Sequence, residues 1–404
     1  MTRRLVASAA LLGALALVVP PLTQSGSAGA PSEVQIPAPL LYSSSFADPT
    51  IVESLVGLVG AATAPDLKIA RSPADAGPWG VTSKPALTRR PTWATSREIW
   101  APDIQRGNRE WLMYFAAGVA GADPESRCIG VARSHTAFGP YTPVGSAPLV
   151  CPVVPGVPTA ADVPPARELG RRVALRGVID PSSFLGRGKR WLVYRTQGQP
   201  STIRLVQLTP GGARIADGQD SRVLTRFSGI EENPVMVRRG RQWVLFTSVG
   251  WFGNCAYRTY WRRSPDLQDW SRSTPRLLLS TEDRLCGPGG ADVLQRKDGA
   301  TQIYFHAWTC FLGPYPCPAN YSRLHPWQRK GVRALYGATL GWAAYQRPYV
   351  ESWIAGVLPQ PPTPTPTPTP DPSETPTPTV PTETVPTETV PTETATEPGT
   401  VSSG

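Results

Sequence analysis

The sequence has few of the residues on which metal sites and activated nucleophiles depend. Of its 404 residues only three are histidine, and none of the three lies at a metal-binding spacing from another. Six cysteines are present without a CxxC pair, so a zinc site would have little to coordinate it. A GxSxG elbow, a Walker loop and a GxGxxG motif after a strand are also missing. These absences argue against zinc enzymes, serine hydrolases of the elbow type and nucleotide-binding folds.

Long hydrophobic runs are also scarce. The longest, Leu5 to Val19, follows Arg3 and Arg4 and precedes small residues up to Ala30, which is the pattern of a secretory signal peptide. Its length is below the roughly 20 apolar residues that a spanning helix needs. We therefore expect no membrane span, and we expect a protein secreted to the extracellular space or associated with the cell wall.

The last segment, 359–404, lacks bases and aromatic residues but contains 14 proline and 15 threonine residues. Such a composition cannot offset the entropy of ordering, so we expect a disordered or polyproline-like tail. The chain is thus divided into a signal peptide at 1–30, one folded domain at 31–358 and a Pro/Thr/Glu-rich low-complexity tail at 359–404. We expect the protein to be a monomer.

The folded domain is strongly basic. Once Arg3, Arg4 and the six acids of the tail are set aside, residues 31–358 carry 38 bases and 24 acids, a net charge of +14. The arginines are scattered and form no block like a nucleic-acid arm, so we expect no nucleic-acid partner. The basic core or the tail is instead expected to favour association with the cell wall. The cysteines of an exported protein indicate disulfides, with 15 possible pairings, and Cys310 with Cys317 would close a local loop.

A repeated strand pattern indicates the fold. Four aromatic and β-branched runs, each entered from a glycine-containing turn, lie at 111–118, 191–198, 243–250 and 302–308. Their spacing of about 50 to 80 residues is roughly that of a four-stranded propeller blade with one or two long loops. With a first unit near 45–95, they predict an all-β, five-bladed β-propeller. A large β-sandwich or a β-helix is the alternative.

An acid stands beside a proline at the start of four of these units. The pairs are Asp48-Pro49, Pro102-Asp103, Asp180-Pro181 and Glu232-Asn233-Pro234. Proline is tolerated at the first residue of a strand. The innermost strands of a propeller begin at one mouth, so these carboxylates would converge on one pit. The alternative interpretation is that Asp-Pro simply begins turns.

Residues 45–345 resemble glycoside hydrolase family 43, the five-bladed propellers that include arabinanases, α-L-arabinofuranosidases and β-xylosidases. The matching stretches are Phe46-Ala-Asp-Pro-Thr50, Trp100-Ala-Pro-Asp-Ile104, Ile179-Asp-Pro-Ser-Ser-Phe184, Glu232-Asn-Pro234, Gly287-Pro-Gly289 and Tyr304-Phe-His-Ala-Trp308. The resemblance implies hydrolysis, with inversion, of polysaccharides or oligosaccharides that contain arabinose or xylose. It also implies that Asp48 is the general base, that Glu232 is the general acid, and that Asp180 orients this acid and tunes its pKa. Glu231 is excluded because the family pattern is acid, any residue, proline.

Four further residues are expected to contact substrate. Trp100 matches a family position that lines the pit, Phe46 stands beside Asp48, and Trp251 lies in the loop after the strand that begins at Glu232. His306 matches a histidine common in the last strand pattern, although a lone histidine in such a strand is more often a packed residue.

A required cofactor is not expected. Many arabinanases carry a histidine after the Gly-Pro-Gly turn, where it helps to hold a central metal ion, and this chain has Gly290 there. The resemblance therefore does not extend to an axial calcium or sodium ion, for which Asp292 and His306 are the remaining candidate ligands.

Two other functions remain open on the sequence. A retaining, fructan-acting propeller would also order Asp, Asp and Glu along the chain, but its families usually have Arg and Cys where this chain has Ile179 and Asn233. A sugar-binding or adhesion propeller that has lost catalysis is the second alternative. The long Pro-rich insertion from Cys151 to Arg172 is expected to wall the site and so to influence endo or exo action.

Overall fold

The computed structural model describes residues 37–119, 124–152, 177–281, 285–310, 317 and 331–357. The expected signal peptide, the tail and most of the Pro-rich insertion lie outside these residues. The chain divides into two compact units, Met1–Leu358 and Pro359–Gly404, and all described residues belong to the first. Among them, no helix has the length and apolar character needed to cross a membrane.

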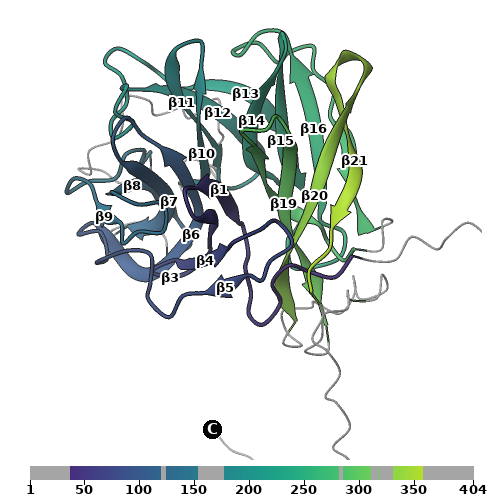
Figure 1. Ribbon diagram of the computed structural model, residues 1–404. Coiled ribbons are helices and arrows are strands. Elements are labelled where there is room, and N and C mark those ends of the chain that lie inside the picture. The colour runs from purple at the N-terminus through teal and green to yellow at the C-terminus, as the bar shows by residue number, and fades with distance from the viewer. Residues whose placement is uncertain are drawn as a thin grey trace, which may run out of the picture. The chain divides into compact units, whose positions relative to one another are not determined.

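The described residues form five antiparallel sheets of four or five strands, which are the blades of a propeller (Figure 1). The first blade has the order β1 (Thr50–Ser54), β2 (Gly57–Ala62), β4 (Lys68–Ser72), β5 (Gly80–Val81), and the second has β3 (Ala64–Pro65), β6 (Ala94–Arg106), β7 (Trp111–Val119), β8 (Arg127–Ser134), β9 (Thr142–Pro143).

The other three blades each have four strands in chain order. They are β10 (Val178–Gly186), β11 (Lys189–Thr196), β12 (Ser201–Leu208) and β13 (Arg222–Phe227); β14 (Glu231–Arg239), β15 (Gln242–Val249), β16 (Arg258–Ser264) and β17 (Arg276–Leu279); and β18 (Gly289–Gln295), β19 (Thr301–Thr309), β20 (Val332–Ala343) and β21 (Arg347–Ile354), with a 3-10 turn at Ala344–Gln346. The predicted five-bladed, all-β fold is confirmed, and the four predicted runs are the second strands β7, β11, β15 and β19.

The innermost strands form a closed ring. Each of β1, β6, β10, β14 and β18 contacts the next, and β1 also contacts β18. The segment before the first blade strengthens this closure, because the backbone N–H groups of Leu40 and Leu41 donate to the carbonyl of Leu335 in the last blade. In Figure 1 the purple first blade accordingly lies beside the green strands of the last one.

The second strands are apolar on both faces because each packs between two blades. Tyr114 of β7 belongs to the core between the second and third blades, and the next residue, Phe115, belongs to the core between the first and second. Leu245 and Phe246 of β15 divide in the same way between the cores on either side of the fourth blade. This two-residue alternation explains why the sequence shows nearly continuous apolar runs there rather than a polar face.

Candidate active site

The first strand of every blade enters the ring through the same backbone corner. Asp48, Ala101, Asp180, Asn233 and Gly290 stand at this corner, and all five have positive φ angles of 45° to 60°. A proline follows four of them, and Ala291 follows the fifth. The left-handed conformation costs a non-glycine residue about 1 to 3 kcal/mol and is concentrated at functional sites. Here it gathers the five corners around one small cavity of about 30 Å³ on the ring axis.

This geometry corrects the sequence prediction that the four acid–proline pairs are equivalent. Pro102-Asp103 is not the equivalent of Asp48-Pro49, because Ala101 occupies the corner and Asp103 lies two residues deeper. Asp103 Oδ2 accepts the backbone N–H of Ser183 at 2.8 Å, and Asp292 Oδ2 accepts that of Ile51 at 2.7 Å. These two acids therefore join neighbouring blades and line the small cavity two residues past the corners, and they are not part of the carboxylate set at its entrance.

Asp48 lies in a polar, partly accessible environment. Its Oδ2 accepts the hydroxyl of Thr63 at 2.8 Å and is 3.6 Å from Nη1 of Arg333, while its Oδ1 is 3.7 Å from Nδ1 of His306. The side chain keeps 17 % of its surface exposed. Thr63 also accepts the backbone N–H of Ala101 at 2.9 Å, so it fixes Asp48 against the second blade. Asp48 is therefore held by a hydroxyl donor and lies near a cation, with part of its side chain open to solvent.

His306 positions Asp48 from below and does not face open space. It is completely buried, and its Nδ1 accepts the backbone N–H of Asp48 at 3.2 Å. The acceptor role places the ring proton on Nε2. Burial and the nearby Arg333 lower the pKa of His306 to about 3, so the ring is neutral. It stacks on Tyr257 with ring centroids 5.8 Å apart. The structure therefore shows His306 as a buried residue that holds the backbone of Asp48.

Glu232 is buried and has defined partners on both oxygens. Oε2 accepts a hydrogen bond from Nη1 of Arg195, and Oε1 lies 2.8 Å from the hydroxyl of Tyr257. The same hydroxyl is 2.7 Å from Oδ1 of Asn233 and has only one proton to donate. The hydroxyl of Tyr257 therefore serves only one of these two acceptors at a time, and its hydrogen bond to Glu232 lowers the pKa of that carboxyl group. Burial raises the pKa of Glu232 despite the opposing effect of Arg195.

The carboxyl group of Asp180 is close enough to that of Glu232 for the two to repel each other. Its Oδ2 accepts the backbone N–H of Asn233, the residue after Glu232, at 3.0 Å. Burial first, and then repulsion from Glu232, raise the pKa of Asp180 to about 8. Asp48 adds to the repulsion on both carboxyls. Two buried acids that repel each other cannot both ionise readily, so near neutral pH the pair holds a proton between them.

Glu231 faces the other way. Its Oε1 accepts from Arg262 and from the hydroxyl of Thr247 at 3.0 Å, and its Oε2 accepts from Thr225 at 2.8 Å. These partners lie on β16, β15 and β13, within and beside the fourth blade. Adjacent residues alternate across a strand, so only one of the two glutamates reaches the pit.

The aromatic residues predicted to touch substrate lie in different surroundings. Phe46 is fully buried in the core between the first and last blades, so the structure does not bring it to the pit. Trp100 is half-buried beneath the guanidinium of Arg127, 4.0 Å from its ring centroid. Trp251 is half-buried and packs at a tilt against Phe252, with centroids 6.0 Å apart.

Sequence reasoning missed several residues around the carboxylates. Two of them belong to second strands of their blades: Thr63 directly follows β2, and Arg195 lies on β11. The other two belong to third strands: Tyr257 directly precedes β16, and Arg333 lies on β20. None of the four stands beside an acid–proline pair at a strand entrance. A signal was present for Arg195, which interrupts the apolar run of β11 while remaining buried. A buried arginine needs an anionic partner. That partner is Glu232.

Gly290 is required by its neighbours. A β-carbon there would lie 2.6 Å from the His306 ring and 3.0 Å from Oδ1 of Asp48, at a φ of +60°. The space that a larger side chain would need at position 290 is therefore already occupied by Asp48, the proposed base, and by His306, which holds its backbone. In the described residues, no group of three or more His, Cys, Asp or Glu side chains is arranged to hold a metal ion. The expectation from the sequence that no cofactor is required stays a prediction.

The fold and its ring of entrance carboxylates place this protein in the class of five-bladed propellers that act on carbohydrate. The model of glycosyl hydrolases family 43 matches residues 47–326, and the chain belongs to that family. It is a glycoside hydrolase.

The solved structures that resemble it extend over most of the chain. A thermostable family-43 glycoside hydrolase has a TM-score of 0.59 and 16 % identity, covering 79 % of this chain and 96 % of its own. An endo-1,4-beta-xylanase from Bacteroides thetaiotaomicron has a TM-score of 0.57 and 15 % identity, and the match covers 80 % of this chain and 100 % of the xylanase chain. An alpha-L-arabinanase from Cellvibrio cellulosa, complexed with arabinohexaose, has a TM-score of 0.57 and 19 % identity. The match covers 76 % of this chain and 95 % of the arabinanase chain. A comparison with curated proteins found no match. At these identities the structural likeness concerns the fold.

Proposed function

We propose that this protein is a secreted enzyme that cleaves polysaccharides or oligosaccharides containing arabinose or xylose, with inversion at the anomeric carbon. The observation that carries the proposal is the contrast between two environments in one pit. Glu232 and Asp180 are buried with raised pKa values, whereas Asp48 is partly accessible and contacts Thr63 and Arg333. Glycoside hydrolysis needs one protonated and one ionised carboxyl group, and this contrast supplies both.

The proposed step uses each residue once. Glu232 gives its proton to the glycosidic oxygen as the bond to the anomeric carbon breaks. Asp48 takes a proton from a water molecule, whose oxygen bonds to the same carbon from the opposite face. An inverting pair stands about 6.5 to 9.5 Å apart to leave room for that water. Burial and then repulsion from Asp48 raise the pKa of Glu232, Asp180 holds the backbone N–H of the next residue, and Arg195 and Tyr257 hold the Glu232 carboxyl group in place.

The arabinose or xylose preference is supported by family membership and by the names of similar structures, an arabinanase and a xylanase among them. Secretion is supported by the amino-terminal sequence pattern and by three disulfides, Cys128–Cys151, Cys255–Cys286 and Cys310–Cys317. The proposed cell-wall association is supported by the basic folded domain.

A substrate panel tests the proposal. The full chain is incubated with arabinan, arabinoxylan, xylan and nitrophenyl α-L-arabinofuranoside, and released sugar is measured. We expect Asp48→Asn and Glu232→Gln each to lower kcat by at least about 100-fold, as expected for loss of a general acid or base. Asp217→Asn, which changes an exposed acid on the β12–β13 connection, is the matched control and should retain full activity. Binding to these polysaccharides without any release of sugar would favour a non-catalytic adhesion propeller instead.

A further inference from the structure

The ring of inner strands has a second mouth, opposite the carboxylate pit. All five inner strands begin at the pit, so the hairpins that follow them lie at the far end of the ring. The far ends of these strands line a cavity of about 330 Å³. This is within the usual size range of small-ligand pockets. Its lining combines apolar side chains such as Leu185 with Arg106, Arg190 and Arg238.

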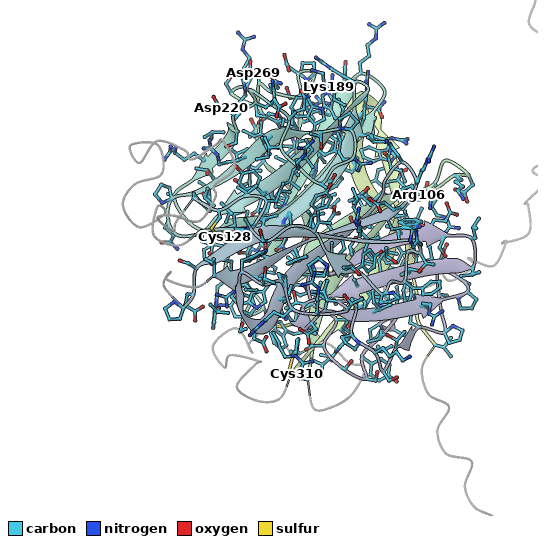
Figure 2. All side chains as sticks on the ribbon, turned by 90° about the vertical axis from the view of Figure 1, so that its left-hand side faces the viewer. Arg106, Cys128, Lys189, Asp220, Asp269 and Cys310 are labelled. Atoms are coloured by element: carbon cyan, nitrogen blue, oxygen red, sulfur yellow. A yellow bond between two sulfur atoms is a disulfide. The ribbon has the colours of Figure 1, made fainter. Side chains whose placement is uncertain are left out.

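Four of the five hairpins around this mouth are strongly basic, while the β1–β2 hairpin has no base and carries Glu53, which lies 3.3 Å from Arg296. Seven exposed bases are found on the four hairpins β6–β7, β10–β11, β14–β15 and β18–β19, and they are Arg106, Arg109, Arg187, Lys189, Arg238, Arg241 and Lys297. The same hairpins carry two acids, Glu110 and Asp298, of which Asp298 lies 3.9 Å from Arg296. Figure 2 shows Arg106 and Lys189 on the side away from Cys128 and Cys310. Such crowding of like charge destabilises the free protein and produces a strong positive potential.

Aromatic rings, and not carboxylates, contact two of these cations and the neighbouring, partly buried Arg239. Arg106 lies over Trp111 at 5.2 Å, Arg238 over Trp243 at 5.4 Å, and Arg239 over Trp342 at 4.8 Å from the ring centroids. A ring fixes the guanidinium without neutralising its charge. Nε of Arg238 donates to the carbonyl of Gly240 at 3.2 Å, so an anion would bind its terminal N–H groups.

Arg190 is a second, independent sign of a ligand. It lines the cavity with only 3 % of its surface exposed, and no carboxylate among the described residues lies within 4 Å of it. Its two terminal nitrogens donate to the carbonyl of Arg106 at 2.7 Å and to the hydroxyl of Ser183 at 3.4 Å, but its Nε has no hydrogen-bond partner in the described residues. Asp103 interacts with Arg190 electrostatically, and burial raises the pKa of Asp103 to about 8, so near neutral pH little negative charge opposes Arg190. A buried cation without a counter-ion calls for an anion from outside.

We propose that this second mouth is a binding site for an anionic polysaccharide, with a negatively charged sugar residue in the cavity and further anionic groups on the surrounding arginines. Guanidinium groups bind carboxylate and phosphate oxygens in pairs. The arginine-covered faces of Trp111, Trp243 and Trp342 do not offer open stacking surfaces for nucleic-acid bases, which favours a sugar polymer over a nucleic acid. The site would hold the enzyme on a charged wall polymer while the pit stays free.

Binding of the full chain to four probes tests the proposal by isothermal titration calorimetry in 150 mM salt. The probes are polygalacturonate, its fully methyl-esterified form, a glycerol-phosphate teichoic acid and a 20-base-pair DNA duplex. We expect binding of one or both charged sugar-bearing polymers, which identifies carboxylate or phosphate as the ligand group, and no binding of the esterified polymer. Equal binding of the esterified polymer, tighter binding of DNA, or binding of neither charged polymer would overturn the proposal.

Paired variants locate the site. Arg106→Gln with Arg238→Gln removes two exposed guanidinium groups at the mouth, and we expect affinity to fall by about 10-fold or more because each group would lose a charge-assisted hydrogen bond to the polymer. Arg89→Gln with Arg226→Gln makes the same charge change at exposed positions that do not line the cavity, and it should change affinity less than twofold. Equal loss in both pairs would contradict the location. The measurement needs no catalysis, so it stands apart from the outcome for the pit.

Discussion

At the scale of single residues, the central feature is a proton shared by two buried carboxyl groups. Asp180 and Glu232 come from different blades and are 52 positions apart in the sequence, yet repulsion between them raises the pKa of Asp180 to about 8. The chemistry predicted from the sequence included this repulsion, although it was expected to act on Glu232. In the structure burial is the largest influence on both groups.

The pair sets a pH limit for activity. One proton must remain on it for Glu232 to act as an acid, and that proton is lost as the pH rises through about 8. We therefore expect kcat/KM on a neutral oligosaccharide to fall above about pH 8, with a slope of one proton. A pH profile checks this, and a flat profile up to pH 10 would contradict the assignment of the acid.

Two substitutions should move this alkaline limit in opposite directions. Asp180→Asn keeps an acceptor for the N–H of Asn233 but removes the repelling charge, so the limit should shift to lower pH. Tyr257→Phe removes a hydrogen bond that lowers the pKa of Glu232, so the limit should shift to higher pH. We expect Tyr257→Phe also to lower kcat by about 10-fold, the value of one hydrogen bond. Shifts in the same direction would show that Tyr257 acts only through packing.

At the scale of elements, each blade enters the ring through one left-handed corner. The sequence predicted these entrances from the prolines, and it placed Asp48 and Asp180 correctly at corners. It misplaced Asp103, because the prolines alone do not show which neighbour adopts the positive φ. Alternation along the strand did separate Glu232 from Glu231. Partners such as Arg195 and Tyr257 depend on long-range packing, which no local pattern contains.

Asp103 and Asp292 act as clips between blades. Asp292 accepts the backbone N–H of Ile51 and so joins the last blade to the first. We expect Asp292→Ala to lower the free energy of unfolding by about 1 to 3 kcal/mol, because it leaves a buried N–H without a partner. Asp292→Asn retains an acceptor and should cost less, while the exposed Asp298→Ala should have almost no effect. Urea unfolding of the three variants measures the difference, and equal values for Ala and Asn would argue against the clip.

At the scale of the whole folded unit, none of the five described sheets combines a strand of the first blade with a strand of the last one. The first and last blades pack through β1 and β18 and through the core that contains Phe46 and Tyr304. Sequence repeats predicted the number of blades, because each second strand must be apolar on both faces. They did not predict the basic second mouth, whose arginines are scattered along the sequence and gather only when the hairpins meet at one end of the ring.

Three disulfides reinforce the unit. The local loop between Cys310 and Cys317 was predicted and is confirmed, whereas the other pairings were open on the sequence. Cys255–Cys286 joins segments 31 residues apart. We expect replacement of both cysteines by serine to lower stability by about 2 to 4 kcal/mol. Thermal unfolding with and without reductant checks this, and an unchanged midpoint for the variant under oxidising conditions would contradict it.

The account as a whole depends on a water molecule between Asp48 and the sugar, on the face opposite Glu232. The anomeric form of the first product tests this most directly, because direct attack by a carboxylate and attack by water give opposite configurations. Proton NMR recorded during the first minutes of hydrolysis should show the inverted anomer, followed by slow mutarotation. The retained anomer as first product would contradict the proposed roles of Asp48 and Glu232.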